Sequence, residues 1–159
     1  MSNLKPYELN VYTKNIATIE IIRDLKKEIF KLPQTLNKSA IVPTEVEASS
    51  IIENMLLKFP MHPFYINYRA DGIIEVLDGY KRLLALNNFI IEDKNWKKPF
   101  RLQNLKYFKE LNGTYYCDLS VEHKRRINEY VFTFHYTMPG TSPKVIEDVL
   151  NRVDYKFWK

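Results

Sequence analysis

The sequence predicts a single α+β domain, in which helices pack around a small mixed sheet. Helical and strand patterns of apolar residues alternate along the chain, as is typical of domains that combine both element types. No repeat and no Ser/Gly-rich linker divides the 159 residues, and this length fits one domain. The chain is 45% hydrophobic and 14% aromatic, so it can bury a substantial core.

The N-terminal part predicts a strand or an arm followed by two helices. Residues 1–14 alternate partly between apolar and polar side chains, which favours a strand or an arm. Apolar residues recur at helical spacing over 18–30, so we expect a helix there. A second helix is expected over 44–57, because Thr44 and Glu47 have the Thr-x-x-Glu spacing of a capping box.

The middle of the chain predicts a β-hairpin that leads directly into a helix. Residues 64–69 and 73–77 are rich in β-branched and aromatic residues, and Ala70-Asp71-Gly72 between them is a typical turn sequence. A helix over 80–91 follows Asp78-Gly79 without a spacer. A strand, a tight glycine turn and a helix N-terminus are therefore expected in immediate succession.

The C-terminal part predicts further strands and two helices. Ser120 is suited to cap the first of these helices, and Ser142-Pro143 to begin the second. Asn112-Gly113 is a typical hairpin turn. The expected elements are a strand at 100–105, an edge hairpin at 107–119, a helix at 120–130, a strand at 131–137 and a helix at 142–153.

Composition excludes several protein classes. The apolar runs fall far short of the roughly 20 residues of a membrane span. The N-terminus has no apolar stretch of the kind found in secretion signals. We therefore expect a cytoplasmic protein that has no membrane partner. The net charge of +5 suits either attraction to phosphates or a well-solvated surface.

The common catalytic and metal-binding motifs are missing from the sequence. His62, His123 and His135 are scattered and match no zinc-binding pattern, so we expect no metal site built on histidine. There is no glycine-rich P-loop of the NTPase type. Cys117 is the single cysteine, which forbids an intrachain disulfide, and we interpret it as a small buried hydrophobic residue rather than a nucleophile.

Residues 78–82 are the segment best suited to carry chemistry. A helix N-terminus has unpaired N–H groups and a partial positive charge, which attract phosphate. Gly79 permits close approach to the backbone, and Lys81 and Arg82 can add contacts to phosphate oxygens. Asp78 can cap the helix, hold a metal-bound water or orient Arg82. In the alternative interpretation Asp78 is simply an N-cap and the two basic residues are solvated.

Several motifs resemble the N-terminal domains of GmrSD-type restriction endonucleases, which belong to the ParB/sulfiredoxin-like superfamily. Asp78-Gly79-Tyr80-Lys81-Arg82 is similar to the D-G-Q-Q-R motif of that family. Residues 51–56 and 59–65 resemble its L-I-E-S-L-L and P-I-P-P segments. Residues 111–119 and 149–154 resemble two short downstream signatures, n-G-k-y-f-s-d-L and I-F-E-R-x-N. The matches follow the order of the family and cover nearly the whole chain.

The resemblance implies a ParB-like domain at 18–155, preceded by the N-terminal strand or arm at 1–17 and followed by a tail at 156–159. It also implies binding of an NTP with Mg²⁺, or of nucleic-acid phosphate. Asp78 would position water, metal or Arg82, so Asp78 and Arg82 are the candidate catalytic residues. The candidate phosphate-binding residues are Gly79, Tyr80, Lys81, Arg82, Lys38 and Arg152, the last closing the site from the final helix.

This chain also departs from the family pattern. Tyr80 and Lys81 replace both glutamines of the central motif. The upstream Q-R pair with its tryptophan is absent, because that region reads Asn37-Lys38-Ser39. Asp154 stands where the family has asparagine. A tyrosine hydroxyl and a lysine ammonium cannot reproduce the paired hydrogen bonds of an amide, so we expect catalysis to be weak or lost.

A second basic cluster lies at 94–101. Lys97, Lys98 and Arg101 alternate with aromatic residues there, a composition that suits stacking on bases together with phosphate contact. The same composition also describes an ordinary exposed loop anchored by a buried tryptophan. The aromatic residues near the C-terminus either dock on the domain or bind a partner.

These observations support two functions. The first is a nucleotide- or nucleic-acid-phosphate-binding domain in phage or anti-phage DNA handling, with little or no catalysis of its own. The second is a non-catalytic structural or interaction protein, for example a phage virion or assembly component that kept the ParB-like fold. For the second function we expect a protein partner or a homo-oligomer.

Overall fold

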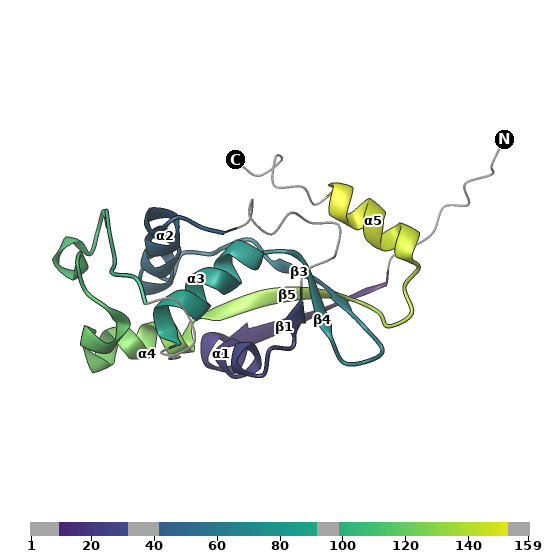
Figure 1. The fold of residues 1–159 in the computed structure, drawn as a ribbon, viewed down its shortest axis with the longest axis horizontal. Coiled ribbons are helices and arrows are strands. Elements are labelled where there is room, and N and C mark those ends of the chain that lie inside the picture. Colours follow the sequence, from purple (N-terminus) through teal and green to yellow (C-terminus); the bar gives the residue numbers. More distant parts are fainter. Residues whose placement is uncertain (1–9, 32–41, 92–98, 153–159) are drawn as a thin grey trace.

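The computed structural model describes residues 10–31, 42–91 and 99–152, which form a small mixed α+β domain (Figure 1). This confirms the predicted α+β class. Within these residues five strands form one mixed sheet, in the order β1-β5-β3-β4-β2. The strands are β1 (Val11–Ala17), β2 (Phe30–Lys31), β3 (Phe64–Tyr68), β4 (Ile74–Asp78) and β5 (Val131–Thr137). The accompanying helices are α1 (Thr18–Lys26), α2 (Glu45–Leu56), α3 (Tyr80–Ile90), α4 (Val121–Glu129) and α5 (Pro143–Arg152).

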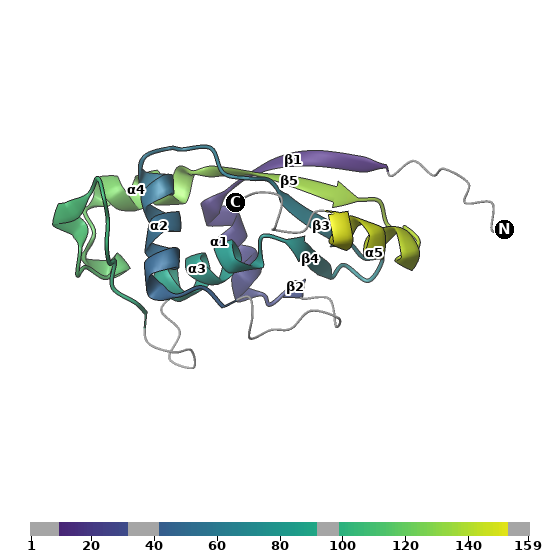
Figure 2. The ribbon, with the colours of Figure 1, turned by 90° about the horizontal axis from the view of Figure 1, so that it is seen from above.

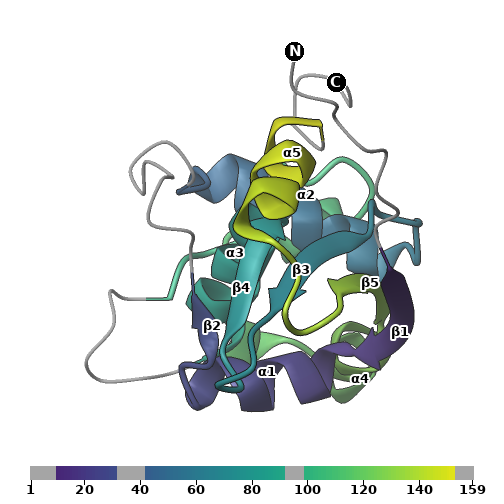
Figure 3. The same ribbon diagram turned by 90° about the vertical axis from the view of Figure 1, so that its right-hand side faces the viewer.

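The sheet combines one local hairpin with pairings between distant segments. Strands β3 and β4 form the predicted antiparallel hairpin. Strand β5 lies parallel to β3 and antiparallel to β1, and so joins the N-terminal strand to the hairpin. Strand β2 pairs in parallel with β4. Strands β1 and β2 are therefore the two edges of the sheet, as Figure 3 shows.

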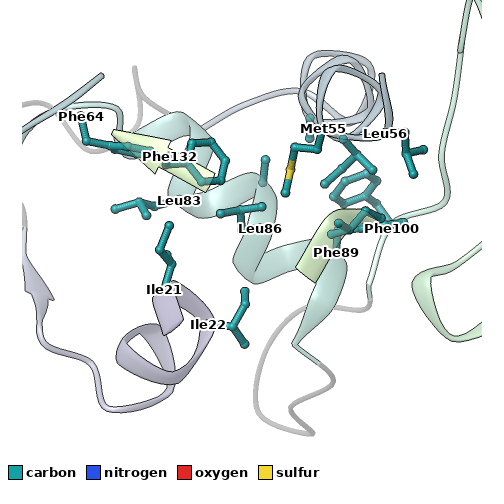
Figure 4. Close-up of a cluster of buried hydrophobic side chains, with 14 of the residues drawn as sticks. Ile21, Ile22, Met55, Leu56, Phe64, Leu83, Leu86, Phe89, Phe100 and Phe132 are labelled. Carbon is teal, nitrogen blue, oxygen red and sulfur yellow. The ribbon is translucent and has the colours of Figure 1, made fainter. Parts of the chain in front are cut away.

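The core lies between the sheet and the first three helices (Figure 4). Phe64 of β3 contacts the rings of Phe132 and Phe134 on β5. Helices α1 to α4 gather at one end of the molecule, whereas α5 lies toward the other end and contacts β4 (Figures 1 and 2). The buried side chains that the helices contribute include Ile21, Ile22, Ile52, Met55, Leu56, Leu83, Leu86 and Phe89.

Local capping signals begin α2 and α4 where the sequence predicts them. The Thr44 hydroxyl accepts a hydrogen bond from the Glu47 N–H at 3.1 Å and begins α2. The Ser120 hydroxyl accepts one from the His123 N–H at the same distance and begins α4. Helix α1 is shorter than expected: it ends at Lys26, and Glu28 adopts a left-handed conformation with φ of 56°. The chain is thereby turned into β2.

Two predicted elements are wrong. Residues 100–105 form no strand, and residues 107–119 form no edge hairpin but two 3₁₀ turns, Lys109–Leu111 and Tyr116–Asp118. The Asn112 side-chain oxygen accepts from the Leu105 N–H at 2.9 Å instead of sitting in a hairpin turn. The segment is thus held by side chains and isolated backbone bonds, a pattern that strand propensity does not reveal.

Candidate functional site

The turn between β4 and α3 is shaped around an aromatic ring. Gly79 is the N-cap residue of α3 and has φ of 108°, a conformation that L-residues with side chains rarely adopt. A Cβ atom at this position would lie 2.2 Å from Cδ1 of Phe64. Glycine is therefore required because Phe64, on β3, packs directly against the turn. The close approach expected of a ligand is made by the protein itself.

Arg82, in the first turn of α3, is directed toward its own chain. Its guanidinium donates hydrogen bonds to the carbonyl oxygens of His62 and Pro63, the latter at 3.3 Å. It also lies 4.2 Å from the centroid of the Phe64 ring and 3.8 Å from the Asp78 carboxylate. Only 13% of the side chain is exposed. Arg82 therefore ties the segment before β3 to the turn after β4.

The electrostatics of Arg82 follow from this burial. Removal from water lowers its pKa, whereas Asp78 and then Tyr130 act in the opposite direction. A desolvated guanidinium needs hydrogen-bond acceptors, and the carbonyls of residues 62 and 63 supply them. An NTP phosphate would have to compete with these internal contacts. The guanidinium of Arg82 is therefore already engaged within the fold.

Lys81 and Tyr80 have different surroundings. The Lys81 ammonium pairs with the Glu47 carboxylate of α2 at 3.0 Å, and both side chains remain partly exposed. This hydrogen bond is the main cause of the lowered pKa of Glu47, with burial acting in the opposite direction. Tyr80 is partly buried, which raises the pKa of its hydroxyl. Lys81 thus links the starts of α2 and α3 at the surface.

Of the other candidate residues, the structure describes only Arg101 and Arg152. Lys38, Lys97 and Lys98 lie outside the described residues. Arg101 is exposed, and its guanidinium lies 4.9 Å from the centroid of the Tyr115 ring. Arg152 is exposed in the last turn of α5. The structure therefore brings together the contiguous residues 78–82, and nucleotide binding there stays a prediction.

Sequence analysis missed two arrangements. Glu53 of α2 is 7% exposed and accepts hydrogen bonds from the N–H groups of residues 106–108. Tyr12, Tyr68 and Tyr136, from three strands, line a pocket of about 500 Å³. Part of the tyrosine arrangement could be predicted from the sequence. Buried and less buried residues alternate over 131–137, which places Tyr136 on the same face of the strand as Phe132 and Phe134. That Tyr12 joins them depends on a strand pairing between the two ends of the chain.

Further expectations concern cysteine, metals and membranes. Cys117 is exposed, so its interpretation as a buried hydrophobic residue is wrong. Among the residues that the structure describes, no group of three or more His, Cys, Asp or Glu side chains is placed to hold a metal ion. Within the same ranges, no helix has the length and apolar character needed to cross a membrane.

Comparisons with known proteins add no relative. No family model, no curated protein and no solved structure matches this chain.

Proposed function

We propose that this chain is a non-catalytic interaction domain that uses a ParB/sulfiredoxin-like fold as a scaffold. The finer fold assignment rests on the order of the motifs that resemble GmrSD N-terminal domains. The same resemblance supports a setting in phage or anti-phage DNA handling, in the cytoplasm or in a virion. The domain would bind a macromolecular partner and would not turn over nucleotide.

The state of Arg82 is the observation that carries this proposal. In the expected nucleotide site, Arg82 would be the group that grips phosphate. Here its guanidinium is bound to the carbonyls of His62 and Pro63 and lies against Phe64. A phosphate that took Arg82 would have to break the hydrogen bonds that the guanidinium donates to these two carbonyl groups, which is costly. The replacement of both motif glutamines, by Tyr80 and Lys81, points in the same direction.

A thermal-shift experiment with a panel of NTPs tests the proposal. We expect saturating NTP, with or without Mg²⁺, to leave the melting temperature of the protein unchanged. A true site at a ligand concentration of 100 times Kd would contribute about 2.7 kcal/mol, which is easily detected. Stabilisation that disappears in Arg82→Lys, a variant that keeps the charge but lacks the planar fork, would contradict the proposal.

Phosphate binding without catalysis is the second candidate function, and Lys81 favours it. Lys81 lies two residues after Gly79, the N-cap of α3, in the first turn, where backbone N–H groups lack intrahelical partners. Its side chain is 34% exposed. Its partner Glu47 is also exposed, so the pair can open at little cost. In this case NTP or single-stranded DNA would stabilise the protein, and Lys81→Ala would abolish the effect. The matched control is Lys109→Ala, at an exposed lysine remote in sequence from the turn.

A further inference from the structure

The tyrosine pocket lies between the edge strand β1 and helix α1. Tyr12 and Tyr136 are cross-strand neighbours on β1 and β5, and Tyr68 ends β3. Together with residues of α1 they line a space of about 500 Å³. Pockets that hold small ligands range from about 300 to 1,000 Å³. The pocket includes Ile74 at the start of β4, about 13 Å along that strand from Asp78 at 3.3 Å per residue.

The tyrosine rings are arranged to hold a positive charge. The rings of Tyr12 and Tyr136 are stacked, with centroids 5.0 Å apart and planes 9° apart. Tyr68 meets Tyr136 at 75°, with 6.4 Å between centroids. The Lys14 ammonium lies 5.7 Å from the Tyr12 centroid and 5.8 Å from the Tyr136 centroid. These distances lie within the range of cation–π attraction, so the ring faces already accommodate one cation.

The wall formed by α1 adds negative charge. Glu20 and Asp24 line the pocket, and the Asp24 side chain is only 26% exposed. Arg23 is 63% exposed and reaches the Asp24 carboxylate only at 3.9 Å, so this pair is weak. The pKa of Tyr136 is raised, mainly by burial and further by Tyr12 and Asp24. Its hydroxyl therefore stays neutral, and the pocket combines ring faces with carboxylate acceptors.

We propose that this pocket binds an organic cation, an alkylammonium or guanidinium group, which takes the place of the Lys14 ammonium. The group belongs either to a small molecule or to a basic side chain of a bound peptide. Lys14 is exposed on an edge strand and can swing into solvent. Once the Lys14 ammonium leaves, the two negative charges of Glu20 and Asp24 exceed the single positive charge of Arg23. The net charge of the pocket wall then favours a cation over a phosphate. The inference is independent of the Asp78–Arg82 turn. If the cation belongs to a basic peptide, that peptide is the macromolecular partner of the interaction domain.

Removing the charge of Lys14 should strengthen the binding of a cationic ligand and weaken that of an anionic one, so the Lys14→Met variant distinguishes the two. Lys14→Met removes the resident cation and keeps an apolar stem, so we expect ethylguanidinium to bind about threefold more tightly. Asp24→Asn removes the carboxylate acceptor, and we expect about tenfold weaker binding. Titrations are followed by the amide NMR shifts of Tyr12, Tyr68 and Tyr136, and the spectrum of each variant shows whether it is folded.

Two matched controls isolate the pocket. The Lys106 ammonium lies 5.7 Å from the centroid of the Tyr107 ring, which is the same type of contact elsewhere on the surface. Lys106→Met should therefore leave binding unchanged. Glu129 is an exposed carboxylate of α4, and Glu129→Gln makes the same change of net charge as Asp24→Asn. This control should also bind like the wild type, because a change of net charge away from the pocket does not remove the carboxylate acceptor.

Two further probes distinguish the source of the cation. A Gly-Arg repeat peptide that binds more tightly than ethylguanidinium identifies a basic peptide as the partner, whereas equal affinity per cation identifies a small molecule. Either result supports the proposal. It is overturned if neither probe shifts the pocket resonances, or if Asp24→Asn has no effect. It is also overturned if AMP binds there and Lys14→Met weakens it, because that result indicates an anion site.

Discussion

Two buried charged side chains each hold an irregular segment in place, Arg82 in α3 and Glu53 in α2. Arg82 donates to the carbonyl oxygens of His62 and Pro63, just before β3. Glu53 accepts from the N–H groups of residues 106–108, at distances of 3.0, 2.9 and 3.1 Å. Both segments lie outside helices and strands, so their backbone groups need partners from elsewhere in the fold. A helix supplies the partner in each case.

The comparison shows that a motif position does not reveal which task a charge performs. Arg82 stands in a motif at the start of a helix, where a ligand role is expected. Glu53 lies inside α2 and was given no role of its own. Both prove to be bound to backbone groups, and they are 13% and 7% exposed. A charged residue can bind a ligand only if its polar atoms do not already hold hydrogen bonds within the fold. Whether they do depends on segments that are far away in the sequence.

The largest effect is expected from removing Arg82. Arg82→Ala removes the hydrogen bonds to the His62 and Pro63 carbonyls and the cation that lies against the Phe64 ring. We expect a loss of about 3 kcal/mol in the free energy of unfolding, or roughly 9 °C in Tm for a chain of this size. Urea unfolding measures it. The control is Arg125→Ala, at an exposed arginine that pairs with Glu122 of its own helix. Equal stability of the two variants would mean that Arg82 is not a structural clamp, that is, a charged side chain whose contacts hold two segments of the fold together.

Removing the Glu53 charge is expected to have the next largest effect. In Glu53→Gln one carboxylate oxygen becomes an NH₂ group, which faces backbone donors instead of accepting from them. We expect a loss of about 2 kcal/mol, since hydrogen bonds to a charged group are stronger than neutral ones. Hydrogen exchange should accelerate at the amides of residues 106–108 while that of β3 is unchanged. The exposed Glu110→Gln serves as the control. A uniform increase in exchange would show global destabilisation rather than release of this segment.

The pH dependence of Glu53 sharpens the same test. Burial raises the pKa of Glu53, but the hydrogen bonds from Lys106, Phe108 and Tyr107 outweigh burial and lower it overall. A lowered pKa in the folded state means that the stabilisation is fully present above the unfolded pKa of about 4.3 and is lost as the pH falls through the folded value. The stability difference between wild type and Glu53→Gln should therefore be constant near neutral pH and shrink in acid. A difference that grows in acid would contradict the assigned cause.

The sequence predicts the fold best where its signals are local. The β3–β4 hairpin and α3 are confirmed because turn residues and apolar periodicity act over a few positions. Strand β2 was missed, since two residues pairing in parallel with β4 leave no periodicity to detect. The 107–119 hairpin was wrong because Asn112, a residue typical of turns, bonds to the Leu105 N–H. In the candidate site, residues 78–82 meet because they are contiguous, but the partners of Arg82 are not local.

The smallest effect is expected at Lys81, next to Arg82 in the same turn. Lys81 and Glu47 are 34% and 46% exposed, so water and salt screen their ion pair. A double-mutant cycle with Lys81→Ala and Glu47→Gln should give a coupling energy of about 0.5 kcal/mol, as exposed pairs do. The coupling should nearly vanish in 1 M NaCl, where the Debye length is about 3 Å. Because Glu47 also bonds to Thr44, the cycle is required: Glu47→Gln alone includes a capping contribution. A coupling above about 2 kcal/mol that resists salt would place Lys81 with Arg82 among the structural clamps, and would remove the one motif cation left to meet a phosphate.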